Sequence, residues 1–177
     1  MLKEFINKEL NEILVAQMGK RNVNSFPKIT KVVLNYRIAD GRDSQEAVAL
    51  ATSELESIAG QKPRLCKAKK SVASFKVRQN EPLALKVTLR GNRMYSFLEK
   101  LFNLVLPRLR DFRGVSASAF DNEGNYNLTI KDQTYFTEVN LDKVNKIRPI
   151  QVTINIKGSS KKEAKMLLSA LGFPFQK

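Results

Sequence analysis

The stretch GQKPRLCKAKKSVASFKVRQNEPLALKVTLRG, from Gly60 to Gly91, joins a strongly basic run to an alternating segment. Between Glu56 and Glu81 the chain carries seven Lys or Arg residues and no acid. From Leu83 to Arg90 apolar and polar residues then alternate with a period of two, which is typical of a strand with one face toward a core. The pattern predicts a rigid strand that carries a projecting basic loop at about residues 67–82.

The composition favours a nucleic-acid partner. The 177 residues suit one well-filled core, so we expect a single domain over residues 1–177. A net charge of +14, with 31 Lys and Arg against 17 Asp and Glu, exceeds what solubility requires and indicates an anionic partner. An acidic membrane surface would call for a basic amphipathic helix, whereas the cations here lie mostly outside the helical stretches. Nucleic acid is therefore the favoured partner.

Several classes of function are disfavoured by what the chain lacks. Histidine is absent and Cys66 is the single cysteine, so Cys/His zinc sites, disulfide frameworks and His-based relays are unavailable. The acid pairs Asp40 with Asp43 and Asp121 with Glu123 lie in turn or capping contexts. No phosphate-binding loop and no apolar run of membrane-spanning length or signal-peptide type is present. We expect a soluble protein of a reducing compartment with no metal, no cofactor and no catalytic activity.

Four helices are expected from apolar spacing and capping residues. They are residues 1–18, a helix from an Asp43–Glu46 capping box to Gly60, a helix from an Asn92 cap to Pro107, and a helix from a Ser160–Glu163 capping box to Gly172.

Four strands are expected from alternation: residues 28–38, 83–90, 126–130 and 150–157, with turn chemistry at 121–125 and a long loop at 131–146. Helices interspersed with hairpin-like turns indicate an α+β domain with a largely antiparallel sheet. Helices would pack on the apolar face and leave the opposite face, rich in Asn, Thr, Lys and Arg, as an RNA platform. The alternative is that any solvent-facing sheet looks polar.

The basic loop suits phosphates and one base. Lys67, Lys69, Lys70, Lys76 and Arg78 surround Phe75, whose ring could stack on a base or could anchor the loop to the protein. The sequence leaves both roles of Phe75 open.

Six motifs resemble the bacterial-type L-five family of large-subunit ribosomal proteins, in the order that family shows. They are GQKP (60–63), AKKSVASFKVRQ (68–79), KVTLRG (86–91), PRLRDFRG (107–114), GNYN (124–127) and the ending GFPFQK. The resemblance implies a component of the central protuberance, with 5S rRNA on the open sheet, a loop near the P-site tRNA, and a surface that meets the small-subunit head protein of the S-thirteen family.

The resemblance also implies roles for individual residues. Asn35, Gln61 and Thr88 match the family's 5S-contacting positions, and the basic residues Lys31, Lys86 and Arg90 belong to the same predicted polar faces. The tRNA-side loop corresponds to Ser71–Asn80, in which Phe75 and Arg78 match the family. With the lysines just before it, the expected contacts are Lys69, Lys70, Ser71, Phe75, Lys76 and Arg78. The region facing the small subunit corresponds to Arg110, Arg113, Tyr135 and Phe136.

The expected function is therefore that of a structural RNA-binding protein of the cytoplasmic ribosome. Its expected partners are 5S rRNA, 23S rRNA, P-site tRNA and the S-thirteen protein, with no membrane and no homo-oligomer. Two other classes are a basic enzyme acting on RNA, which would need an acid or histidine constellation that we do not find, and a protein-interaction module whose charge is incidental. A protein-interaction module would carry no RNA on purification, which distinguishes it from an RNA-binding protein.

Overall fold

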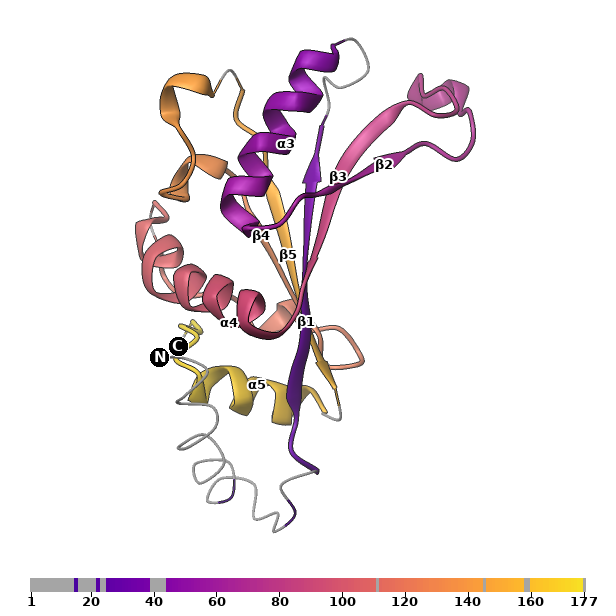
Figure 1. Cartoon of the computed structure of the whole chain (residues 1–177). Helices are drawn as coiled ribbons and strands as arrows, with labels where there is room; N and C mark the ends of the chain where they lie inside the picture. The colour runs from indigo at the N-terminus through magenta and orange to yellow at the C-terminus, as the bar shows by residue number, and fades with distance from the viewer. Residues whose placement is uncertain are drawn as a thin grey trace. The chain divides into compact units, whose positions relative to one another are not determined.

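A computed structural model describes residues 15, 22, 25–38, 44–110, 112–144, 146–157 and 160–176 (Figure 1). The helix predicted over residues 1–18 falls outside this part of the chain, apart from Val15, which is helical. The described strands and α-helices are β1 (Lys28–Arg37), α3 (Gln45–Ala59), β2 (Arg64–Lys67), β3 (Pro82–Leu89), α4 (Gly91–Lys100), β4 (Tyr126–Ile130), β5 (Ile150–Lys157) and α5 (Lys161–Ala170).

The strands form one five-stranded antiparallel sheet in the order β2-β3-β1-β5-β4, which confirms the predicted α+β class. All four predicted strands are present within a residue or two of their expected bounds. The sequence did not predict β2, because its four residues, RLCK, are too short to show a period. Strand β2 pairs with β3, so the basic segment lies between two paired strands.

Two compact units make up the chain. Unit 1 comprises residues 1–32, 90–128 and 153–177, and unit 2 comprises residues 33–89 and 129–152.

In unit 2, the N-cap of α3 is one residue later than the predicted Asp43, which lies outside the described residues. The capping box predicted at Asp43 is wrong, because Ser44 has the extended backbone of an N-cap and its hydroxyl accepts a hydrogen bond from the Ala47 amide. The helix ends as predicted at Gly60, which adopts the left-handed φ of 63° and donates its amide to Glu56. Its inner stripe of Ala51, Leu55 and Ile58 is buried.

In unit 1, α4 also differs from its predicted start. Arg90 is the N-cap and Asn92 lies inside the helix, so the Asn92 cap is wrong. Regular helix ends at Lys100, and the chain continues through a π-helical turn, Leu101–Val105, and a 3-10 turn, Leu106–Arg108. Pro107 sits in this last turn, where the helical path ends as predicted.

Helix α5 has the predicted capping box. The Ser160 hydroxyl accepts from the Glu163 amide, and the Glu163 carboxylate accepts from the Ser160 amide. In unit 1 the rings of Phe102, Tyr126 and Phe173 pack edge to face, with centroids 5.0 and 5.1 Å apart. No helix in the described residues is both long enough and apolar enough to cross a membrane.

Candidate nucleic-acid interface

Strands β1 and β3 present one buried and one open face in unit 2. Leu34 and Tyr36 of β1 are fully buried, whereas Asn35 between them is half-buried. On β3, Leu85 is buried, Lys86 is exposed and Thr88 is half-buried. The buried face is the one toward α3, because Tyr36 is hydrogen-bonded to Glu54 of that helix. The predicted polar face is therefore open at Lys86, half-buried at Asn35 and Thr88, and buried at Val33.

The strand register places three polar side chains next to one another across β2, β3 and β1. Arg64 of β2 pairs directly with Lys86 of β3. The Ile38 amide donates to the Leu83 carbonyl at 3.0 Å, so these two residues lie opposite each other. Because β1 and β3 are antiparallel neighbours, the residue three before Ile38 lies opposite the residue three after Leu83, which places Asn35 beside Lys86. We call Arg64, Lys86 and Asn35 the cationic row. Arg64 is not among the predicted site residues, because β2 itself was not predicted.

The other residues predicted to contact 5S rRNA lie at different positions. Thr88 is on β3 two residues from Lys86, on the same face, and Gln61 is half-buried just after α3. Lys31 is half-buried on β1, and Arg90 is exposed at the start of α4; both belong to unit 1. Of the predicted residues, Asn35, Lys86 and Thr88 thus share one face within unit 2, and Arg64 adds to them.

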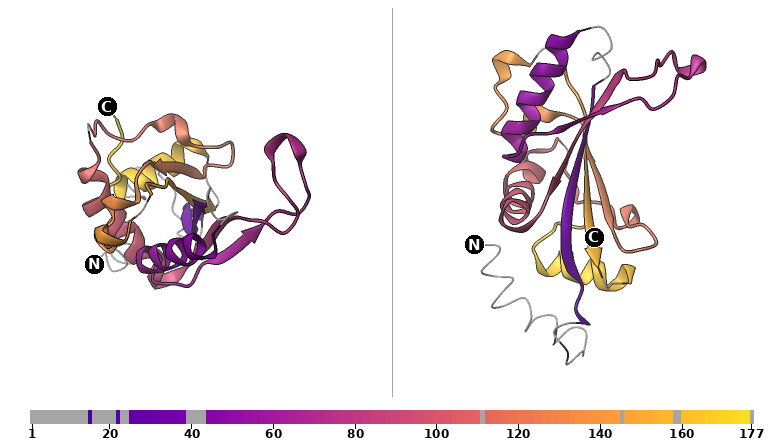
Figure 2. Two further views of the ribbon diagram at one scale, coloured as in Figure 1. Left: turned by 90° about the horizontal axis from the view of Figure 1, so that it is seen from above. Right: turned by 45° about the vertical axis from the view of Figure 1, so that its right-hand side comes forward.

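The basic loop is a hairpin extension of β2 and β3. Val72 and Val77 exchange backbone hydrogen bonds of 2.9 and 3.1 Å, and a 3-10 turn, Ala73–Phe75, forms the tip. The hairpin reaches away from α3 and β1 (Figures 1 and 2). Phe75 is 73% exposed, so it does not serve as a buried anchor. Phe75 therefore lies at the tip with most of its side chain exposed.

The cations of the loop surround that ring. Lys69, Lys70, Lys76 and Arg78 lie on either side of it, mostly exposed, and the Ser71 hydroxyl is used within the loop, where it accepts from the Gln79 amide at 3.0 Å. Lys76 has a left-handed φ of 52°, which turns the chain back toward β3. Ser71 therefore shapes the loop, while the cations face solvent.

The residues predicted to face the small subunit differ in exposure. Arg110 is exposed and Arg113 lies near it in unit 1, and Tyr135 is half-buried in unit 2. Phe136 is only 1% exposed, so it contributes to the core of unit 2. Phe136 could act at this surface only indirectly, by holding in place the loop that carries Tyr135.

Part of the polar face is occupied by bonds within the protein. In unit 1 the Thr30 hydroxyl donates to the Asn155 carbonyl at 3.2 Å, and the Thr153 hydroxyl donates to Asn127 Oδ1 at 2.8 Å. Buried Asn125 accepts from Asn155 Nδ2 and donates to the Asp121 carboxylate. These polar residues of β1, β4 and β5 bind one another, which alternation alone does not predict.

Asp121 completes this arrangement at the β4 turn. Its Oδ1 accepts from the amides of Glu123 and Asn125 at 2.9 and 2.8 Å. Burial opposes ionisation of this carboxyl, but the hydrogen bonds from Asn125 and Glu123 outweigh it and hold its pKa below the ordinary value. Asp121 thus serves the turn, as expected for an acid in that context.

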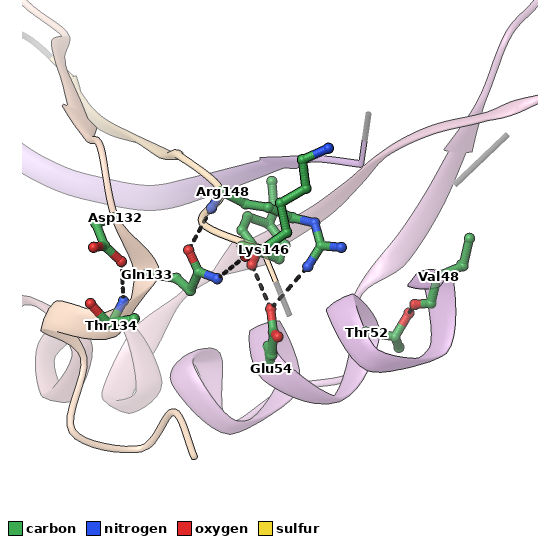
Figure 3. A network of polar contacts seen from close by, with 9 residues as sticks. Val48, Thr52, Glu54, Asp132, Gln133, Thr134, Lys146 and Arg148 are labelled. Atoms are coloured by element: carbon green, nitrogen blue, oxygen red, sulfur yellow. Dashed lines mark hydrogen bonds and ion pairs between the residues drawn. The ribbon is translucent and has the colours of Figure 1, made fainter. Parts of the chain in front are cut away.

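A buried polar network links Gln133, Lys146 and Arg148 with Glu54 of α3 (Figure 3). Tyr36 donates to Glu54 Oε2 at 2.5 Å, and Arg148 Nη1 lies 3.7 Å from the same oxygen. Gln133 receives the Arg148 amide on Oε1 and donates from Nε2 to the Lys146 carbonyl. Burial, together with the hydrogen bond to Glu54 and its charge, raises the pKa of Tyr36 well above its ordinary value.

Two family models match consecutive parts of the chain. The model described as "Ribosomal protein L5" matches residues 22–78, and the model of the C-terminus of the same ribosomal family matches residues 82–175. Between them they include every strand and α-helix described above.

Curated relatives match along almost the whole length. A protein of Thermoanaerobacter sp. named "Large ribosomal subunit protein uL5" is 46% identical over 176 residues, which cover 99% of this chain and 98% of the relative. Proteins of the same name from Psychrobacter cryohalolentis and Psychrobacter arcticus are 46% identical over 175 residues, with the same coverage. These matches confirm the predicted family, a structural and non-enzymatic family of the cytoplasmic ribosome. The chain belongs to the bacterial-type ribosomal protein L5 family and is a structural constituent of the large ribosomal subunit.

Proposed function

We propose that the chain binds 5S rRNA through the open face of β1 and β3 and helps to form the central protuberance. The observation that carries this proposal is the cationic row, in which exposed Lys86 stands between Arg64 and Asn35 on one face. Arg and Lys attract phosphates, and the amide of Asn35 and the hydroxyl of Thr88 can hydrogen-bond to sugars or base edges. Lys31, Gln61 and Arg90 extend the proposed contact along the chain.

The hairpin tip is proposed to contact the P-site tRNA. Its four cations around the exposed ring of Phe75 combine phosphate attraction with a surface on which a base or ribose can pack. The hairpin is joined to the cationic row through β2 and β3, so one pair of strands would hold 5S rRNA at its base and tRNA at its tip.

Two further partners complete the proposal. Arg110, Arg113 and Tyr135, with Phe136 fixing the loop beneath, are proposed to face the small-subunit head protein of the S-thirteen family. Exposed cations elsewhere on a chain of net charge +14 suit additional contact with 23S rRNA.

Filter binding of 5S rRNA tests the central part of the proposal. Asn35→Ala and Thr88→Ala should weaken binding by about five- to thirtyfold together, since each removes one or two hydrogen bonds from the interface. Ser57→Ala, on the exposed side of α3, is the matched control and should bind normally. Unchanged affinity of the folded double variant would overturn the assignment of this face.

A further inference from the structure

Gln133 lies at the start of the segment 133–144 in unit 2, and its side chain is fully buried. Its Oε1 accepts a hydrogen bond from the Arg148 amide, and its Nε2 donates one to the Lys146 carbonyl at 2.7 Å (Figure 3). One side chain thus bonds to two backbone groups that lie 13 and 15 residues further along the chain. The two bonds fix the start of the segment against the residues that lead into β5.

The backbone of Gln133 fixes the same part of the chain a second time. Its carbonyl accepts from the Phe136 amide at 3.1 Å and closes a 3-10 turn, Gln133–Tyr135. The Asp132 carboxylate accepts from the Thr134 amide at 2.8 Å at the start of that turn. Tyr135 therefore lies in a turn that Gln133 holds through both its backbone and its side chain.

Apolar side chains near this turn are exposed to solvent. Leu141 is 65% exposed and Ile147 is 63% exposed, and Tyr135 is half-buried. Among the described residues of unit 2, the other exposed large hydrophobic side chains, Val72 and Phe75, belong to the hairpin. Apolar side chains gain free energy from contact with another apolar surface and do not attract phosphates. The residues around Tyr135 therefore suit a protein partner better than RNA.

We propose that Gln133 is a positioning residue for the surface around Tyr135, which it holds in the binding conformation before the partner arrives. The inference rests on the proposed contact of Tyr135 with a protein of the small subunit. A segment that is ordered in advance loses less conformational entropy on binding, so the same contacts give a higher affinity. Without the two side-chain bonds, the segment would become ordered only in the complex.

The alternative is that Gln133 serves only the stability of unit 2. Buried backbone N–H and C=O groups need partners, and an apolar residue at position 133 would remove two such bonds. The two roles predict different behaviour of the segment. A purely stabilising role affects the free and the bound protein alike, whereas a positioning role is visible before binding and is restored by the partner.

Hydrogen exchange of large subunits that carry variants of the full chain tests the positioning. Gln133→Met roughly keeps the size of the side chain and removes both bonds, and Gln133→Asn, one methylene shorter, is a milder second variant. In both, amides of residues 134–144 should exchange about fivefold faster than in wild type, or more. Added small subunits should restore the wild-type rate. Wild-type exchange without small subunits, or fast exchange that persists with them, would overturn the proposal.

Subunit association measures the contribution of this positioning to affinity. Large subunits with Gln133→Met should bind small subunits about two- to twelvefold more weakly, as expected for the entropy of ordering one side chain. Ile58→Ala removes buried methyl groups from the core of unit 2 and is the control for lost stability. It should leave association unchanged, and equal weakening by both variants would show that stability alone acts and would overturn the proposal.

Tyr135→Ala distinguishes a failure of the inference from a failure of the proposed contact. If Tyr135→Ala weakens subunit association and Gln133→Met does not, the contact is correct and Gln133 is not its positioning residue. If neither variant weakens association, the proposed contact is wrong and the inference is overturned with it.

Discussion

Arg64 on β2 lies directly opposite Lys86 on β3, so two cations form a cross-strand pair on the exposed face of the sheet. Like charges opposite one another destabilise a sheet by a few tenths of a kcal/mol. A polyanion lying over the pair would be attracted by both cations and would offset the repulsion between them. The pair therefore contributes little to folding and is suited to binding.

Removing either cation of the pair should change binding and stability in opposite directions. Arg64→Gln or Lys86→Gln should weaken 5S rRNA binding and reduce the slope of log affinity against log salt by about one. The free energy of unfolding should rise by about 0.2–0.5 kcal/mol, because the cross-strand repulsion is removed. Filter binding between about 50 and 200 mM salt and urea unfolding measure the two effects. Lys162→Gln, at an exposed position of α5, is the control, and an equal loss of slope there would argue against a specific role for the pair.

The tip of the hairpin should act on tRNA without affecting 5S rRNA. Phe75→Ala should weaken P-site tRNA binding to ribosomes by about 1–3 kcal/mol if the exposed ring stacks on a base. Phe75→Tyr keeps an aromatic face and should bind normally. Deletion of residues 69–78 should loosen tRNA in the same assay and spare 5S binding. Loss of 5S binding on deletion would show that the row and the tip are not separate surfaces.

Tyr126 should make the protein sensitive to alkali. Burial raises its pKa to about 12 from an ordinary value of 10.0, so the folded protein holds this proton more tightly than the unfolded chain does. The corresponding stability is fully present below about pH 10 and is lost as pH rises from about 10 to 12. Tyr126→Phe loses the hydrogen bond from the hydroxyl to the Ser116 carbonyl and should be less stable near neutral pH. Its free energy of unfolding should nevertheless fall less steeply than that of wild type in alkali; parallel curves would contradict the assignment.

Two glycines should differ in their tolerance of a methyl group. Both have positive φ, but a Cβ at Gly114 would lie 2.6 Å from the Gln176 backbone nitrogen, whereas a Cβ at Gly60 meets nothing within 4 Å. Gly60→Ala should cost about 1–2 kcal/mol from backbone strain alone. Gly114→Ala should cost more, about 3 kcal/mol, because strain and a backbone clash combine. Thermal unfolding of the two variants compares them directly, and equal losses would contradict the close approach at Gln176.

Much of the fold could be predicted because the strands alternate, the helices have apolar stripes, and α5 carries its capping box. The open face followed from the same alternation, which put Lys86 and Thr88 opposite the apolar residues of β3. Other features carried no such signal. Ser44 and Asp43 are adjacent residues of capping type, and the sequence does not choose between them. Tyr135 and Phe136 are adjacent aromatics in a segment without a period, so the burial of Phe136 was not predictable.

The candidate site was predictable only within single strands. Alternation assigns side chains to faces, but it does not say which residue of one strand stands opposite which residue of the next. The pairing of Arg64 with Lys86 needed the register of a strand too short to recognise. The buried contacts of Glu54 with Tyr36 and Arg148 likewise join residues that are distant in sequence.

The hydrogen bond from Thr30 to Asn155 joins positions 125 residues apart, whereas the Arg64–Lys86 pair closes within one hairpin. Contacts between distant residues close large loops and form slowly, and local hairpins form in microseconds. During synthesis the pairing between β2 and β3 can begin as soon as β3 has left the ribosome, but the Thr30–Asn155 contact must wait until β5 has emerged. The order of synthesis therefore lets the hairpin of β2 and β3 pair before the contact between β1 and β5 can form.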